Sequence, residues 1–153
     1  MSISFTVSGH AKPKGSMRAF VPKGWKRPIL TNASLATKTW EQSVRLASQE
    51  FANTYTTDPV RVRLRFSLPR PKSLSSRASR AHVKRPDLDK LIRACLDAMT
   101  GVLWADDSQV YSLSATKCYA LADKAPHVTI TVSAKLYDDK HGDNRHSSNR
   151  SVP

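Results

Sequence analysis

The sequence predicts a single α+β domain, with a mixed or mainly antiparallel sheet and helices packed on one of its faces. Residues 60–68 alternate strictly between apolar and polar side chains, which is typical of a strand with one buried face. Residues 88–99 instead place apolar side chains at helical spacing. A chain of 153 residues has room for one such domain, which we expect to span 1–136 and to be followed by a disordered polar tail at 137–153.

The N-terminal part is expected to hold a strand, a long loop and a helix. Apolar and polar residues alternate over 3–7, which predicts a short strand. Glycines and prolines recur through the basic segment 9–28, which predicts a loop, and loops of this length are often functional. An approximate apolar stripe predicts a helix from 33 to about 51, capped by Asn32 or Ser34.

The strand at 60–68 has two very different faces. One is purely apolar, and the other carries Arg61, Arg63 and Arg65. Such a row of arginines requires either solvent or anions, so a solvated face and a DNA-binding face are both open interpretations. The serine- and arginine-rich segment 69–84 that follows is expected to be a flexible arm that orders on a phosphate backbone.

The C-terminal part is expected to hold a second helix and two strands. Asp87 takes the N-cap position of the helix at 88–99, and Gly101 marks its C-terminal stop. A turn at 104–108 then leads into the remaining elements, which we expect to form a hairpin: strands at 110–119 and 127–136 joined by a loop at 122–126.

The charge of the chain points to a polyanionic partner. Twenty-five lysines and arginines against twelve acidic residues give a formal net charge of +13. The signs are segregated, since no acidic residue precedes Glu41 and none lies between Asp58 and Asp87. A basic protein that is merely soluble would mix its charges, so nucleic acid is the favoured partner. The candidate DNA-binding residues are Lys12, Lys14, Arg18, Arg61, Arg63, Arg65, Arg77, Arg80, Lys84 and Arg85.

Other features of the sequence exclude several classes of protein. Cys95 and Cys118 lie in apolar-periodic segments and are expected to be buried thiols in a reducing compartment. The histidines show no zinc-ligand spacing. No apolar run approaches the ~18 residues of a membrane helix, and the N-terminus lacks the pattern of a signal peptide, so no membrane partner is expected.

A cluster of acidic residues stands out in this basic chain. Mg²⁺ or Mn²⁺ prefers oxygen ligands, and phosphodiester hydrolysis gives a reason to gather them. Asp87 and Asp89 can project past the helix N-terminus, and the turn is expected to face Asp106 or Asp107 toward them. Spacing alone leaves a purely structural alternative open: an N-cap at Asp87, an ion-pair ladder of Asp89, Arg93 and Asp97, and an ordinary turn at Asp106-Asp107.

Three linked motifs carry a family resemblance over residues 85–110. They read R-P-D-L-D-K-L from Arg85, L-D-A-M from Leu96, and G-V-L-W-A-D-D-S-Q-V from Gly101. This order and spacing resemble the RusA-type Holliday junction resolvases, whose pattern is D-x-D-N opening a helix, a D-A-L segment, and W-x-D-D-x-Q-V leading into a strand. The N-terminal strand and the loop at 12–16 are similar in kind, while the segment beyond Leu136 matches nothing.

The resemblance implies a homodimer that binds four-way DNA junctions and makes paired, symmetric nicks with Mg²⁺ or Mn²⁺. It places the catalytic, metal-binding carboxylates at Asp87, Asp89 and Asp107. Arg93 stands where the family has a catalytic lysine, and Lys90 stands where it has an asparagine. Because arginine keeps its charge but does not release a proton, Arg93 or Lys90 is expected to act electrostatically. Phage and prophage members of the family imply a bacterial cytoplasmic location.

Two other functions fit the same sequence. One is a non-catalytic, structure-selective nucleic-acid-binding protein whose acidic residues only cap a helix and a turn. The other is a less selective metal nuclease that acts on flaps or replication forks. Metal-dependent nicking of a junction separates the first from a resolvase, and a comparison of substrates separates the second.

Overall fold

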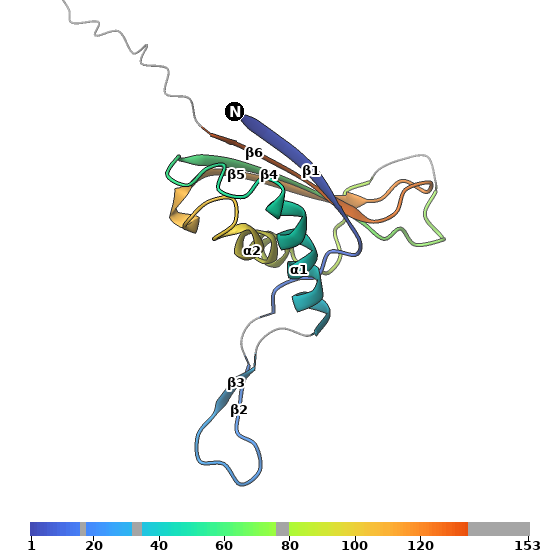
Figure 1. The fold of residues 1–153 in the computed structure, drawn as a ribbon. Helices are drawn as coiled ribbons and strands as arrows, with labels where there is room; N and C mark the ends of the chain where they lie inside the picture. Colours follow the sequence, from blue (N-terminus) through green and yellow to red (C-terminus); the bar gives the residue numbers. More distant parts are fainter. Residues whose placement is uncertain (16–17, 32–34, 76–79, 135–153) are drawn as a thin grey trace, which may run out of the picture.

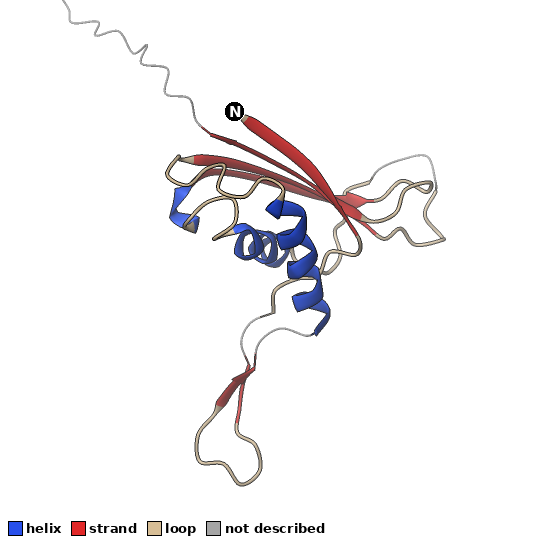
Figure 2. Cartoon of the chain, viewed as in Figure 1, coloured by secondary structure: helices blue, strands red, loops and turns tan. Residues whose placement is uncertain are grey.

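A four-stranded sheet carries two α-helices on one of its faces (Figure 1, Figure 2). The computed structural model describes residues 1–15, 18–31, 35–75 and 80–134. The elements in chain order are β1 (Ser2–Ser8), β2 (Arg18–Phe20), β3 (Ile29–Thr31), α1 (Leu35–Gln49), β4 (Val60–Leu68), α2 (Leu88–Met99), the 3-10 turn η1 (Asp107–Gln109), β5 (Val110–Tyr119) and β6 (His127–Ala134).

The sheet is mixed, which confirms the predicted α+β class. Its strand order is β1-β6-β4-β5, with antiparallel pairs β1/β6 and β6/β4 and a parallel pair β4/β5. The parallel pair is joined through α2, because two parallel strands need a crossover between them. The helices cover only one side of the sheet, as expected (Figure 1).

The predicted hairpin of β5 and β6 is wrong, because β4 lies between these two strands. The core-facing side chains of β4 are all 1% exposed or less, so this strand takes an interior place with neighbours on both sides. The segment after β5 passes the end of β4, where the Ala120 amide donates to the Leu68 carbonyl at 2.7 Å. Adjacency in sequence therefore does not give adjacency in this sheet.

The core lies between the sheet and the two helices. Strands β1, β6 and β4 turn their alternating apolar residues toward the helices, as the sequence predicts for β4. Cys95 is buried in this core, and its burial raises the pKa of the thiol to about 12, while Cys118 is half-buried. The helix residues that meet the sheet include Trp40, Val44, Leu91, Ala94, Cys95, Ala98 and Met99.

The predicted loop at 9–28 contains a strand. Residues 18–20 pair antiparallel with residues 29–31, so β2 and β3 form a hairpin of their own that projects away from the sheet (Figure 1). Three-residue strands are too short for an alternation signal in the sequence. The helix α1 ends at Gln49, two residues before the predicted end, and its candidate caps Asn32 and Ser34 lie outside the described residues.

Part of the predicted flexible arm at 69–84 is tied to β5. The Tyr119 amide donates to the Arg80 carbonyl at 3.0 Å, and the His82 amide donates to the Lys117 carbonyl at 3.1 Å. This end of the arm is therefore an added edge segment of the sheet, and residues 76–79 lie outside the described part. The predicted tail at 137–153 also lies outside it. Among the described residues, no helix is both long and apolar enough to cross a membrane.

Candidate functional site

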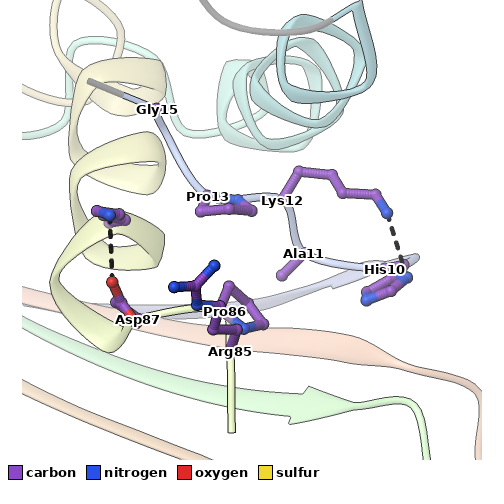
Figure 3. Close-up of a pocket in the computed structure, with 9 residues that line it drawn as sticks. His10, Ala11, Lys12, Pro13, Gly15, Arg85, Pro86 and Asp87 are labelled. Atoms are coloured by element: carbon purple, nitrogen blue, oxygen red, sulfur yellow. Dashed lines mark hydrogen bonds and ion pairs between the residues drawn. The ribbon is translucent and has the colours of Figure 1, made fainter.

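A cleft lies between the start of α2 and the segment that follows β1. One wall consists of residues between His10 and Gly15, and the other consists of Arg85, Pro86, Asp87 and Lys90 (Figure 3). Its volume is about 660 Å³. The cleft brings the predicted catalytic residue Asp87 together with two predicted DNA-binding residues, Lys12 and Arg85.

Residues 9–15, hereafter the strap, are hydrogen-bonded to three separate parts of the chain. The Gly9 amide donates to the Pro126 carbonyl at 2.8 Å, and the Lys14 amide donates to the Lys90 carbonyl of α2 at 3.0 Å. The Thr37 hydroxyl of α1 donates to the Pro13 carbonyl at 3.1 Å. The cleft wall opposite Asp87 is therefore a fixed part of the fold.

The Lys14 side chain is bound within the protein. Its ammonium group forms a hydrogen-bonded ion pair with Asp97 and lies 3.6 Å from a carboxylate oxygen of Glu41. The hydrogen bond with Asp97 is the main reason why the pKa of Lys14 is raised. In this structure the ammonium group is therefore engaged within the protein, and the DNA-binding role of Lys14 stays a prediction.

Asp87 and Asp89 lie at the N-terminal end of α2, where both are exposed. Asp87 has the extended backbone of an N-cap residue, but its side chain makes no capping hydrogen bond. One of its carboxylate oxygens lies 3.1 Å from the Lys90 ammonium group (Figure 3). The side-chain oxygens of Asp87 therefore face solvent and a cation, and the interpretation of Asp87 as only a helix cap is not supported.

The structure places Asp107 at the opposite end of α2. A carboxylate oxygen of Asp107 accepts hydrogen bonds from the hydroxyl of Thr100, which is the C-cap of this helix, and from the Trp104 indole at 3.2 Å. A helix of 12 residues is roughly 18 Å long. The expectation that the turn faces Asp107 toward Asp87 is therefore wrong within one chain, because the turn follows the C-terminus of the helix.

Consistent with this separation, the described residues contain no group of three His, Cys, Asp or Glu side chains able to hold a metal ion together. Asp87 and Asp89 remain as a pair of exposed carboxylates beside the positive end of the α2 dipole. Two carboxylates are enough for Mg²⁺ when water and a substrate phosphate supply the other oxygens. The donor set at this helix end therefore fits such an ion.

The second aspartate candidate, Asp106, has a structural role. Its carboxylate accepts a hydrogen bond from the Ser108 amide at 2.8 Å, and the contact with Ser108 lowers the pKa of this carboxyl group. The Gln109 side chain closes the same turn by accepting from the Ala105 and Asp106 amides at 2.8 and 3.1 Å. Both residues hold η1 in shape and leave Asp107 exposed at its start.

The two predicted cationic residues of α2 differ in their contacts. Lys90 is ion-paired with Asp87, whereas Arg93 is exposed one turn further along. Within the described part of the chain, no ion pair joins Arg93 to Asp89 or Asp97, since Asp97 pairs with Lys14. The ion-pair ladder of the structural alternative is therefore not formed among the described residues of this helix, and the catalytic role of Arg93 stays a prediction.

A match to a known protein family extends over most of the chain, including the site described above. The family model for the endodeoxyribonuclease RusA matches residues 11–133, which include most of the strap, both helices and the η1 turn. The chain belongs to the RusA family. It is also 28% identical over 140 residues to the uncharacterized protein YqaN of Bacillus subtilis (strain 168), a match that covers 85% of this chain and 94% of the relative. RusA membership indicates an endonuclease that resolves Holliday junctions.

The RusA chain carries its arginine row on the face of the sheet away from the helices. Arg61, Arg63 and Arg65 are exposed and alternate with buried residues of β4. The Arg61 guanidinium also lies 5.9 Å from the centre of the Tyr111 ring. The cross-strand neighbours of the three arginines are all hydroxyl residues, namely Ser133, Thr131 and Thr129 on β6 and Ser112, Ser114 and Thr116 on β5.

The predicted DNA-binding residues of this RusA-family chain therefore form two groups. Lys12 and Arg85 line the cleft beside Asp87, whereas the arginine row lies on the opposite face of the sheet. Arg80 and Lys84 are exposed on the segment that links β4 to α2. Of the others, Lys14 is bound within the protein, Arg18 is described only as a backbone position of β2, and Arg77 lies outside the described residues.

Sequence reasoning missed the residues that position the catalytic candidates of this chain. The Lys117 ammonium group donates to the carbonyls of Lys84 and Pro86 at 2.7 and 2.6 Å and so fixes the chain just before Asp87. One feature of the sequence could have indicated this role of Lys117. It is a lysine at a core-facing position of β5, opposite Phe66 of β4. Thr100 and Trp104 hold Asp107 in the same way, and their role is not visible in any spacing pattern.

The strap contacts of this RusA chain lead to a prediction about stability. We expect Lys14→Met to lower the free energy of unfolding by on the order of 1–2 kcal/mol, measured by urea denaturation. The reason is that Glu41 has a buried carboxylate oxygen with no hydrogen-bond partner in the described part of the chain, and Lys14 is the cation beside it. Adding Glu41→Gln to Lys14→Met should restore part of the loss.

Lys12→Met is the matched control, because Lys12 lies on the same strap and its ammonium group contacts only the His10 ring, at 3.4 Å, in the contacts that the structure describes. It should change the free energy of unfolding by less than ~0.5 kcal/mol. Equal losses in the two variants would contradict the assignment of Lys14 as the residue that fixes the strap.

Proposed function

We propose that this RusA-family chain is a Mg²⁺- or Mn²⁺-dependent endonuclease that resolves four-way DNA junctions by paired, symmetric nicks, and that it acts as a homodimer. The observation that carries the proposal is the exposed pair Asp87 and Asp89 at the start of α2, beside a cleft with basic walls. These carboxylates have no structural hydrogen bonds in the described part of the chain that would explain their place in so basic a protein.

Asp87 and Asp89 would hold the divalent ion. When bound, such an ion activates water and neutralises charge on the phosphate that is attacked. Lys90 already balances the charge of Asp87 and would share its ammonium group with the phosphate once DNA is bound. Arg93 contributes a fixed positive charge one helical turn away, and it stabilises the negative charge that develops on the phosphate without donating a proton.

The position of Asp107 supports the proposed homodimer. If Asp107 is the third carboxylate that the family resemblance implies, the roughly 18 Å length of α2 prevents it from reaching Asp87 in the same chain. A two-fold dimer can bring the N-terminal end of α2 in one protomer against the η1 turn of its partner, and symmetry then repeats the contact. Each site would combine Asp87 and Asp89 with Asp107 of the partner subunit.

Two such sites across a two-fold axis suit a junction that has an approximate two-fold axis itself. Lys12 and Arg85 would hold the backbone of the strand in the cleft. The arginine row on β4 faces away from this cleft and would hold a different arm of the junction. At one end of the row, Arg65, Lys124 and His127 line a hollow of about 220 Å³, which is suited to phosphate oxygens.

The direct test is incubation of the protein with a labelled synthetic four-way junction, with and without Mg²⁺. We expect symmetric paired nicks with the ion and binding without cleavage in its absence. Flap and fork substrates of the same sequence serve as controls and should be cut more slowly. Binding without any metal-dependent nicking would instead support a structure-selective binding protein, and equal cutting of all branched substrates would support a less selective nuclease.

The arginine row leads to a prediction about DNA binding. Replacing Arg61, Arg63 and Arg65 together by glutamine should weaken the binding of all DNA forms and reduce the salt dependence of log K by up to about one unit per lost phosphate contact. The measurement is a titration of labelled junction and duplex at several salt concentrations. An unchanged salt dependence would show that this face of the sheet points away from DNA.

A further inference from the structure

The tip of the β2–β3 hairpin presents a tryptophan to solvent. Trp25 is 61% exposed, whereas the other two tryptophans of the chain, Trp40 and Trp104, are 4% and 1% exposed. The hairpin projects away from the sheet and helices (Figure 1). An indole side chain offers a large apolar surface, and leaving it in water is unfavourable unless a partner covers it.

The turn that carries Trp25 is defined by the backbone. The Trp25 amide donates to the Pro22 carbonyl at 3.0 Å, and Gly24 between them has a φ of 92°. This left-handed conformation is readily adopted by glycine and strained for other residues. The indole is therefore presented on a closed turn, which lowers the entropy that is lost when a partner binds.

The charge around Trp25 selects the kind of partner. Lys23, Lys26 and Arg27 are exposed on the same turn, and no acidic residue precedes Glu41 in the chain. The complementary partner has a dense negative charge together with flat apolar faces, and nucleic-acid bases on their phosphate backbone have both.

The location of the hairpin favours DNA over other anionic partners. Gly15 lines the cleft beside Asp87, and β2 begins at Arg18. Three residues span at most about 10 Å, so DNA that entered the cleft would lie next to the base of the hairpin. A branched molecule that enters the cleft therefore passes along an arm with a basic, aromatic tip.

We propose that Trp25 stacks on a base exposed at the branch point of the DNA, while Lys23, Lys26 and Arg27 contact the neighbouring phosphates. A continuous duplex buries the faces of its bases, whereas a branch point interrupts the stack and exposes them. The hairpin thus contributes to the preference for branched over linear DNA. This inference rests on the proposed function, since it takes branched DNA as the substrate.

The test compares variants of the full chain for binding to a labelled four-way junction and to a linear duplex, in buffer with EDTA so that no cleavage occurs. Trp25→Ala should weaken junction binding by roughly 5- to 100-fold, weaken duplex binding much less, and leave the salt dependence unchanged. Trp25→Phe should keep most of the affinity, because a phenyl ring also stacks. Val21→Ala is the matched control on the same hairpin, since Val21 is 58% exposed but cannot stack, and it should bind normally.

Intrinsic fluorescence gives an independent readout. Trp25 is the exposed tryptophan of the chain, so junction binding should quench emission and protect it from acrylamide in the wild type but not in Trp25→Phe. Thermal melting of all variants should be unchanged. Equal junction affinity of Trp25→Ala and wild type would overturn the inference. If Trp25→Ala lost the dimer in sedimentation, the hairpin tip would be assigned to contact with a second copy, and the inference would also be overturned. Quenching of the wild-type fluorescence by anionic vesicles but not by DNA would overturn it as well.

The outcomes also separate this inference from the proposed function. If the wild type nicks junctions with Mg²⁺ and Trp25→Ala binds and nicks them equally well, only the stacking role is wrong. If the wild type neither prefers nor nicks a junction, the proposed function itself is wrong, and Trp25 then has no branch point on which to act.

Discussion

Asp87→Asn is expected to abolish Mg²⁺-dependent junction cleavage while DNA binding persists or tightens. The variant loses a metal ligand, so the rate should fall by on the order of 10³-fold or more, at least as much as for a lost stabilising donor in a preorganised site. Removing a carboxylate also lowers the repulsion of phosphate. Asp89→Asn should behave in the same way. The measurement is single-turnover cleavage of a labelled junction at saturating protein.

Two other aspartates serve as matched controls for this prediction. Asp123→Asn removes an exposed carboxylate from the segment between β5 and β6 and should cut at the wild-type rate. Asp97→Asn removes the partner of Lys14, so it should lower stability and keep most of the cleavage rate. An Asp87→Asn protein that cuts at the wild-type rate would show that the start of α2 is not the metal site.

The parts of this fold that follow from the sequence are those set by local burial. The alternation in 60–68 predicts β4 and its two faces, since successive side chains of a strand point to opposite sides. The apolar stripe in 88–99 predicts α2 with the bounds that the structure shows, and Gly101 ends it with a φ of 74°. The position of Asp87 and Asp89 at the N-terminus of this helix follows from the same pattern.

The parts that do not follow depend on contacts between segments distant in the sequence. Lys14 pairs with Asp97 across 83 positions, and no local pattern distinguishes this lysine from a DNA-binding one. The insertion of β4 between β5 and β6 depends on three segments at once, so adjacency in sequence suggests a hairpin that does not form. The distance of Asp107 from Asp87 depends on the length of α2. The motif spacing alone does not indicate whether Asp107 belongs to the site of its own chain or to that of a partner subunit.

The proposed sharing of Asp107 between subunits leads to the prediction that two inactive proteins restore activity when mixed. Asp87→Asn and Asp107→Asn proteins should each fail to nick a junction as pure dimers. After joint unfolding and refolding at equal concentration, about half of the dimers contain one subunit of each kind. In every such dimer, one site combines the native Asp87 of one subunit with the native Asp107 of the partner subunit, and the other site has neither.

The mixture should therefore recover about one quarter of the wild-type nicking sites, and its product should be singly nicked junction rather than resolved duplexes. Asp87→Asn mixed with Asp89→Asn is the matched control. Both of these residues lie on α2 of one chain, so every site in that mixture lacks one carboxylate and no activity should return. If the first mixture also stays inactive although labelled subunits exchange, Asp107 does not act across the dimer. If Asp107→Asn alone nicks at the wild-type rate, Asp107 is not a ligand, and its hydrogen bonds to Thr100 and Trp104 are structural.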